Sequence, residues 1–302
     1  MSDIPSKAIS QSTENKVHSA LVKAFEKWTT PVDIRPDGVF GSVATIKCNG
    51  VTISSDELDV EFTTSFDDDM ESNDAEIIIY NLTDSTINQF KKDKEITIEA
   101  GYKGDTGVLF SGFVTKVTTT RDGADKKTKI KAADDIKEHT VESLSFAKGT
   151  KASKILKKLL KKTGIPIAVF KVRRDHTYKD GETVDGDLME NIRKYATVCG
   201  ISVYVSKGKI YARYIKNGDN ISFTVSSDTG MIGYPNPYTE EVTAEDFKET
   251  VNGYDIEMLL QHRMCAGAII NLKSKVATGQ YRVCSGSHSF ASWEAVTKIK
   301  VY

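Results

Sequence analysis

The cysteine and histidine residues of this sequence are the groups whose spacing could support nucleophilic chemistry. Cys265 follows His262 by three residues, and His288 follows Cys284 by four. Because a reactive thiolate needs a nearby base, either pair could serve a peptidase. With four cysteines and five histidines in 302 residues, such spacings also arise by chance. We therefore expect neither pair to be catalytic.

The acidic segment Asp67–Asp74, with the sequence DDDMESND, is the second group with chemical potential. Its carboxylates occupy alternate positions, as in a calcium loop, but it lacks the turn glycine and the closing bidentate glutamate of such a loop. Glycine-rich phosphate motifs, HExxH and GxSxG are absent from the sequence. Among 42 acidic residues, context marks out no carboxylate pair for sugar hydrolysis. The sequence predicts a solvated turn, no catalytic centre, no metal and no cofactor.

Charge is strongly segregated along the chain, although the formal net charge is only −1. Residues 48–90 contain eleven acidic and no basic residues, whereas residues 147–179 contain eleven basic residues and one acid, Asp175. This pattern predicts two surfaces of opposite sign, which face each other or different partners. In the lysine-rich stretch 148–162, Leu and Ile alternate with Lys at helical spacing and no aromatic platform is present. A solvated helix face is therefore favoured over a nucleic-acid site, and an acidic partner surface could also meet it.

Most of the chain has the period-two pattern of β-strands. Between residues 42 and 137, apolar residues such as Val60, Phe62 and Phe66 alternate with polar ones, and turn-forming segments separate the runs. Residues 221–302 return to the same pattern. Several short strands at close spacing indicate antiparallel barrels or sandwiches.

The middle of the chain has helical periodicity instead. The pattern predicts a first helix that Ser153 could cap and that Gly164 and Pro166 end, and a second helix from Asp185 to Gly200. A hairpin over residues 201–214, with a Lys-Gly turn, follows. These elements indicate a compact α/β unit.

The N-terminal segment reads as an isolated amphipathic helix over residues 12–30, with Leu21, Phe25 and Trp28 in its apolar stripe. Its stripe must be buried against its own chain or in a partner groove. The N-terminus lacks the apolar core of a signal peptide, and no run is long enough to span a bilayer. We therefore expect synthesis in a reducing cytoplasm, four free thiols and no membrane partner.

Together these patterns predict an α+β, mainly β fold in which two antiparallel β-barrel-like domains flank a small α/β domain.

Four ordered phrases carry a resemblance to a known family: Glu76–Leu82 (EIIIYNL), Ala100–Gly104 (AGYKG), Phe110–Val114 (FSGFV) and Ile130–Asp135 (IKAADD). This order resembles the first barrel of the phage tail baseplate hub family, which includes the late control protein D group and prophage tail hub proteins. Residues 147–167 and 186–213 are similar to its α/β domain, and residues 226–237 and 259–290 to its closing barrel.

The resemblance implies a structural hub in the virion tail baseplate. It also implies the divisions of the chain: an N-terminal arm with the helix (1–41), a first tube-like barrel (42–143), the α/β domain (144–222) and a second tube-like barrel (223–302). Three chains, each with two such barrels, would adapt the six-fold tail tube to a three-fold spike or tail tip. The implied partners are copies of the chain itself, the tail tube protein, the spike or tail-tip protein and the tape-measure protein. Genomic DNA would pass through the channel without specific binding. The first 40 residues have no obvious place in the family pattern. We expect no fused lysozyme or peptidase module after the hub, and therefore no lytic activity.

An acidic channel wall would repel phosphate, so the resemblance gives five acids a possible role at the lumen or at a ring interface. These residues are Asp59, Glu61, Asp67, Asp68 and Asp69; a merely solvated turn is the alternative. Leu21, Phe25 and Trp28 are the expected docking residues of the N-terminal helix. The competing functions are a tail-associated cell-wall hydrolase and a carbohydrate-binding β-module.

Overall fold

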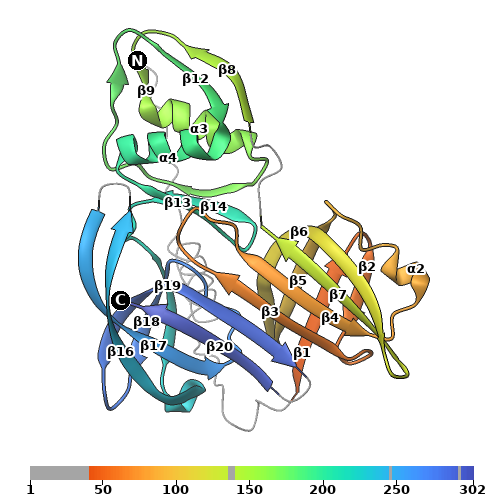
Figure 1. Ribbon diagram of the computed structural model, residues 1–302. Helices are drawn as coiled ribbons and strands as arrows, with labels where there is room; N and C mark the ends of the chain where they lie inside the picture. Colours follow the sequence, from red (N-terminus) through yellow and green to blue (C-terminus); the bar gives the residue numbers. More distant parts are fainter. Residues whose placement is uncertain (1–40, 135–139, 245–246, 292–293) are drawn as a thin grey trace, which may run out of the picture. The chain divides into compact units, whose positions relative to one another are not determined.

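The computed structural model describes residues 41–134, 140–244, 247–291 and 294–302 (Figure 1). The predicted helix with Leu21, Phe25 and Trp28 lies outside the described residues and stays a prediction. No helix of the described part is long and apolar enough to cross a membrane.

Three groups of elements follow one another along the chain. The N-terminal β unit holds β1 (Ser42–Cys48), β2 (Val51–Ser54), β3 (Val60–Phe66), β4 (Asp74–Tyr80), the short helix α2 (Asp84–Ile87), β5 (Glu95–Tyr102), β6 (Asp105–Asp122) and β7 (Asp125–Ala133). The α/β unit holds β8 (Thr140–Phe146), β9 (Thr150–Lys151), α3 (Ala152–Lys162), β10 (Ile167–Phe170), β11 (Thr177–Tyr178), β12 (Glu182–Asp187), α4 (Leu188–Cys199), β13 (Ser202–Ser206) and β14 (Lys209–Arg213). The C-terminal β unit holds β15 (Asp219–Val225), the 3-10 turn η2 (Ser227–Thr229), β16 (Met231–Ala244), β17 (Phe247–Leu259), β18 (Ala268–Lys273), β19 (Thr278–Ala291) and β20 (Glu294–Val301).

The predicted mainly β, α+β class is confirmed. The two β units have separate cores, and antiparallel pairing of β3 with β19 joins their strands into one 13-stranded sheet. In the described residues its order is β16-β17-β20-β19-β3-β4-β7-β6-β5-β1-β2, with β18 paired to β19 and β15 to β18. β8 spans the predicted boundary at 143/144 and pairs with β12, and β15 spans the boundary at 222/223. The division into four domains stays a prediction.

Strict alternation of buried and exposed residues builds the N-terminal core. On β3, Val60, Phe62, Thr64 and Phe66 are buried while the residues between them face outward, as the period of two requires. The inward residues of β4, β5 and β7 complete the same core with aliphatic side chains, notably Ile77, Ile79, Ile96, Ile98 and Ile130. One face of this sheet is therefore buried in the core, and the other faces outward.

The two helices of the α/β unit pack against each other over a separate core. The prediction that Ser153 caps α3 is wrong, because the helix begins at Ala152 and Lys151 is its N-cap. The Ser153 N–H and hydroxyl both donate to the carboxylate of Asp175, at 2.9 and 2.8 Å. Asp187 caps α4, two residues after the predicted start, and Gly200 ends it in the left-handed conformation, as predicted.

Candidate functional site: the seam between the two β units

The pairing of β3 with β19, which we call the seam, is where the two β units meet (Figure 1). Phe62 and Phe290 lie opposite each other with stacked rings, 5.5 Å apart at 7°. Phe290 belongs to the N-terminal core, and Phe66 belongs to the C-terminal core. Each β unit thus places an aromatic side chain in the core of the other.

A glycine on β19 makes this close packing possible. Gly286 lies directly opposite Phe66, and a Cβ at Gly286 would stand 2.5 Å from the Phe66 ring. Any larger residue would have to displace that ring or the neighbouring strand β20. The glycine therefore sets how near the two strands and their side chains can come.

His288 is completely buried beside the seam. Its Nε2 lies 3.2 Å from the Met264 carbonyl, which can only accept, so Nε2 carries the proton and donates. Nδ1, 2.8 Å from Oγ1 of Thr297, then accepts from that hydroxyl. Burial lowers the pKa of His288 to about 3, with the nearby Lys207 charge acting in the same direction. His288 is therefore a neutral structural side chain.

The cysteines do not form the thiol and imidazole pairs that their spacing allowed. Cys284 donates its thiol to the Lys300 carbonyl, at 3.2 Å. His262 lies 3.0 Å from Asp105, which also receives two bonds from Arg263 at 2.6 and 2.7 Å. In the part of the chain that the structure describes, no hydrogen bond joins either cysteine to its neighbouring histidine. His262 and Arg263 fasten the loop after β17 to Asp105 at the start of β6.

Burial of neutral His288 predicts a loss of stability in acid. The pKa of His288 is lower in the folded state than in the unfolded state, so its full contribution to stability is present above the unfolded pKa near 6.5. This contribution is lost as pH falls below that value. Relative to His288→Gln, the wild-type protein is expected to lose about 2 kcal/mol of unfolding free energy between pH 7 and pH 5. Urea unfolding of both proteins at the two pH values measures this difference.

Two buried acids act in the opposite sense and make the variant comparison necessary. Burial raises the pKa of Asp134 to about 6, and burial with the Asp69 carboxylate raises that of Asp67 to about 7. Because the pKa of each acid is raised in the folded state, its contribution to stability falls as pH rises above about 4, the pKa of an unfolded aspartate. Both acids are present in wild type and in His288→Gln, so they cancel in the difference. Parallel pH curves for the two proteins would contradict the assignment of His288.

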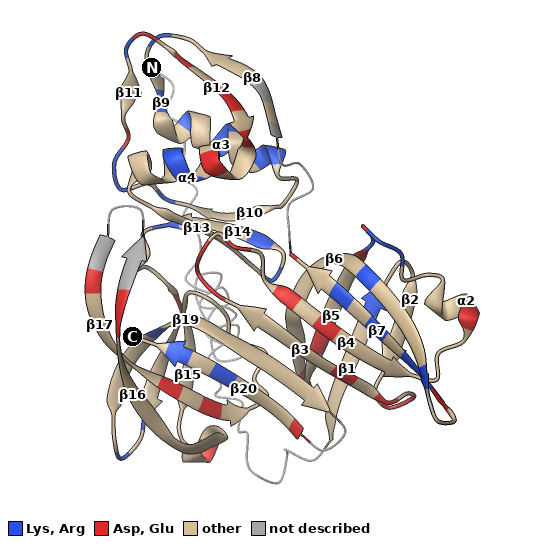
Figure 2. Cartoon of the chain, viewed as in Figure 1, with Lys and Arg blue, Asp and Glu red and all other residues tan. Residues whose placement is uncertain are grey.

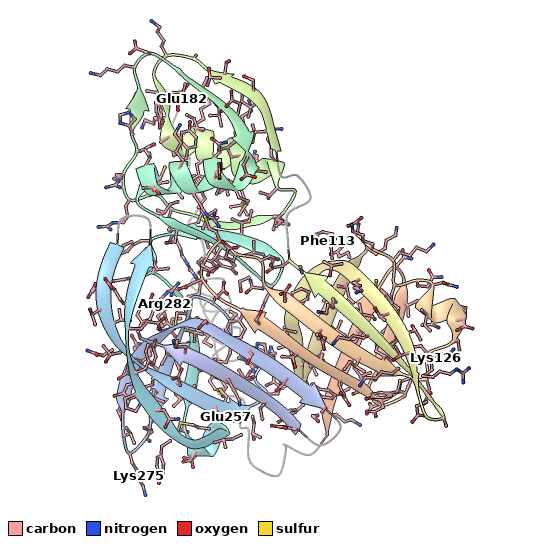
Figure 3. All side chains as sticks on the ribbon, in the orientation of Figure 1. Phe113, Lys126, Glu182, Glu257, Lys275 and Arg282 are labelled. Atoms are coloured by element: carbon pink, nitrogen blue, oxygen red, sulfur yellow. The ribbon has the colours of Figure 1, made fainter. Side chains whose placement is uncertain are left out.

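The acidic turn between β3 and β4 holds three parts of the chain together. Asp68 forms an ion pair with Arg282 of β19 (Arg282 is labelled in Figure 3), in which only 17% and 5% of the two side chains are exposed. Arg282 also donates to the Asn217 carbonyl and to the Tyr302 hydroxyl, at 3.1 and 3.2 Å. Burial disfavours the charge on Arg282, but the Asp68 carboxylate raises the pKa of Arg282 and keeps its guanidinium charged. Burial also raises the pKa of Asp68, and the Arg282 charge opposes this shift.

The same turn also contacts the α/β unit. Glu71 pairs with Arg193 of α4 at 2.5 Å, on the surface. Buried Asn73 donates to Asp134 through its backbone N–H and side chain, at 2.7 and 2.9 Å, and its amide lies 3.4 Å from the Val205 carbonyl. The sequence predicts a solvated turn, but most of its polar side chains form hydrogen bonds or ion pairs within the chain.

The five acids predicted for a lumen or interface fall in different places. Glu61 lies on the outward side of β3 and accepts from the Tyr80 hydroxyl at 3.3 Å, while Asp59 is exposed just before β3. Asp67, Asp68 and Asp69 lie in the turn, where Asp68 faces Arg282 and Asp69 accepts from the Glu71 N–H at 2.6 Å. The structure therefore does not bring the five together on one surface.

The outward side of the joined sheet, which we call the shared face, crosses the seam without interruption (Figure 2). Along the seam this face carries hydroxyls, with Ser65 beside Ser287 and Thr63 beside Ser289, and Glu61 lies on the same side of β3. Charged residues flank the seam on both sides and pair with each other. The pairs are Lys129–Glu76 at 2.5 Å, Lys298–Glu257 at 3.8 Å and Lys300–Glu240 at 2.5 Å.

Sequence reasoning missed the roles of Gly286 and His288 at the seam and of Arg282 and Asp134 at the acidic turn. Arg282 had a usable signal, because it is the one Lys, Arg, Asp or Glu in the 14 residues of β19. A lone charge in an otherwise uncharged strand needs a partner if the strand is buried. Within the described residues, no group of three or more His, Cys, Asp or Glu side chains is placed to hold a metal ion.

Two β units that share one sheet, with an α/β unit between them in the sequence, define a fold found among tail and secretion proteins. A tail protein from Neisseria meningitidis MC58 matches with a TM-score of 0.60 at 9% identity, over 87% of this chain and 96% of that one. The 43 kDa tail protein of prophage MuSo2 from Shewanella oneidensis matches with 0.57 at 9%, over 86% and 97%. A type VI secretion system component from E. coli matches with 0.58 at 10%, over 85% and 76%.

The family is shown by the sequence itself. The model of the family described as baseplate hub gp41 matches residues 71–284, so this chain belongs to that family. No curated protein matches the sequence. The predicted resemblance to phage tail hub proteins is thereby confirmed.

Proposed function

We propose that this chain is the structural hub of a phage or phage-like tail, where three copies form a ring between a six-fold tail tube and a three-fold spike or tail tip. The seam is the observation that supports this most directly. It fixes two β units of one chain in a single register, so three chains would present six such units to the tube. Membership of a baseplate hub family agrees with a place in the virion tail.

The proposed partners are further copies of the chain, the tail tube protein, the spike or tail-tip protein and the tape-measure protein. We assign the shared face to the channel, through which genomic DNA passes. Its centre carries hydroxyls, and Glu76, Glu257 and Glu240 pair with lysines of the same face, which lowers its attraction for phosphate. Asp59 and Glu61 remain our candidates for the lumen, and Asp67 and Asp69 for a ring interface, whereas Asp68 is committed to Arg282.

In this proposal the hub is not an enzyme. The groups that could have formed a nucleophilic pair serve internal hydrogen bonds instead, which agrees with a structural role. Leu21, Phe25 and Trp28 of the N-terminal arm would dock on a neighbouring subunit.

Mass measurement on the purified full-length chain tests the ring. The expected result is a species of three chain masses, and rings when tail tube protein is added and the mixture is viewed by electron microscopy. A chain that stays monomeric and forms no ring with tube protein would contradict the proposal. Release of muropeptides from peptidoglycan would point to the hydrolase, and glycan binding without rings to the carbohydrate-binding module.

A further inference from the structure

Helix α3 presents a face made of lysine. Lys154, Lys157, Lys158 and Lys161 are exposed on it, while the opposite side of the helix buries its Ile and Leu residues in the α/β core. Figure 2 shows basic residues on this helix. Among the described residues, no ion pair involves any of these four lysines, which we call the lysine face.

The lysine face is unfavourable for the isolated chain. Its residues are spaced three and four apart, at 154/157, 154/158, 157/161 and 158/161, and like charges at these spacings repel each other. The first turn of the helix carries no acidic residue, so Lys154 stands at the positive end of the helix dipole. The fold thus accepts a repulsion that neutral residues would avoid.

The acidic part of the chain does not relieve this repulsion. Several of its exposed carboxylates pair with lysines of their own β unit, as in Lys103–Asp56, Lys126–Asp84 and Lys129–Glu76. Exposed Glu71 pairs with Arg193 of α4 and not with α3. Asp175, the one acid within residues 147–179, is taken up by Ser153 at the start of α3. Several carboxylates of the acidic part thus have ion-pair partners elsewhere, whereas the four lysines of the lysine face have none among the described residues.

We infer that the lysine face is a docking surface for an acidic surface of another protein. Charge complementarity carries this inference, because four positive heads held on one rigid helix suit a row of carboxylates. Lys157 and Lys158 are already positioned, with their ammonium groups 5.6 and 5.1 Å from the ring centres of Phe170 and Phe146. Such ordering reduces the entropy lost when a partner binds. The inference goes beyond the proposed hub function and does not depend on it.

The chemistry of this surface favours protein over nucleic acid. Phosphate is bound best by the forked guanidinium group, but Arg173 stacks on Tyr214 and Arg174 donates to the carbonyls of Thr197 and Val198. The rings of Phe146 and Phe170, which could stack on bases, lie under lysines.

A membrane surface is also disfavoured. A peripheral helix that binds lipid combines basic residues with exposed apolar anchors. The exposed large apolar side chains of the described residues are Ile232, Tyr234 and Val276, and all three belong to the C-terminal β unit.

Binding of a fluorescent poly-L-glutamate peptide to the purified full-length chain tests the inference. We expect binding that weakens as salt is raised, and an affinity about tenfold lower in Lys154→Gln/Lys158→Gln/Lys161→Gln. Glutamine keeps the helix propensity and removes the repulsion, so this variant is expected to fold at least as well as wild type. Circular dichroism and thermal unfolding verify this.

The matched control is Lys91→Gln/Lys92→Gln/Lys275→Gln, which removes the same charge at exposed sites on other elements (Lys275 in Figure 3). We expect it to bind the peptide as wild type does. Equal losses in the two triple variants would overturn the inference, because net charge alone would then explain binding. Tighter α3-dependent binding of a DNA duplex of equal charge, or of phosphatidylglycerol vesicles, would overturn it in favour of those partners.

Discussion

Replacing Arg282 by methionine is expected to lower the free energy of unfolding by about 3–5 kcal/mol. The variant leaves the Asp68 carboxylate largely buried and without its partner, and a lone buried charge is strongly unfavourable. It also removes the donor to the Asn217 carbonyl, which helps fix the start of the C-terminal β unit. Urea unfolding at pH 7 measures the loss.

Two further variants separate the buried pair from a general effect of removing an arginine. In Asp68→Asn/Arg282→Met the unpaired charge is absent, so we expect at least half of the loss to be recovered. Arg193→Met breaks the exposed pair with Glu71, where 46% and 75% of the side chains are accessible, and should cost within about 1 kcal/mol. Equal costs for Arg282→Met and Arg193→Met would show that burial of the Asp68 pair is unimportant.

The sequence predicts faces and helix ends well, because both depend on neighbouring residues. Alternation on β3 places Val60, Phe62 and Phe66 inward, and Gly200 ends α4 in the conformation that glycine favours. It misplaces the cap of α3, because the oxygen that accepts from Ser153 belongs to Asp175, which is 22 residues away.

The partner of each strand is not contained in such local patterns. A period of two tells which side of β3 is buried. It does not tell which strand pairs with β3, because every strand with the same alternating pattern fits equally well. The seam depends on contacts between residues far apart in the chain, of which Asp68 and Arg282, 214 residues apart, are one pair. For this reason the sequence does not predict that β3 pairs with β19 and joins the two β units in one sheet.

The acidic turn shows the same limit for the candidate site. Asp67, Asp68 and Asp69 resemble one another in sequence, and composition alone predicts that all are solvated. Their surroundings differ because Arg282 reaches Asp68 from β19 while Asp69 stays exposed and accepts from the Glu71 N–H. An acid's role here is decided by a distant residue, which a charge count cannot identify.

Truncating Phe290 to alanine is expected to destabilise the seam by about 3–5 kcal/mol. The side chain is 4% exposed, lies in the N-terminal core and stacks on Phe62, so its removal leaves a cavity between the two β units. In a double-mutant cycle with Phe62→Ala, the two rings should couple by about 0.5–1.5 kcal/mol. Tyr234→Ala, at a ring 59% exposed, should cost less than about 0.5 kcal/mol and serves as the control.

Hydrogen exchange locates the effect of Phe290→Ala within the molecule. Amides of β3 and of residues 286–290 on β19 should exchange faster, while those of α3, which packs in a separate core, should keep their rates. Uniform acceleration in all three units would contradict a role specific to the seam.

If three chains present six β units as proposed, a loosened seam no longer holds the two units of a chain in register. The variant should then fold but yield fewer trimers, because a closed ring requires both units in fixed positions at once.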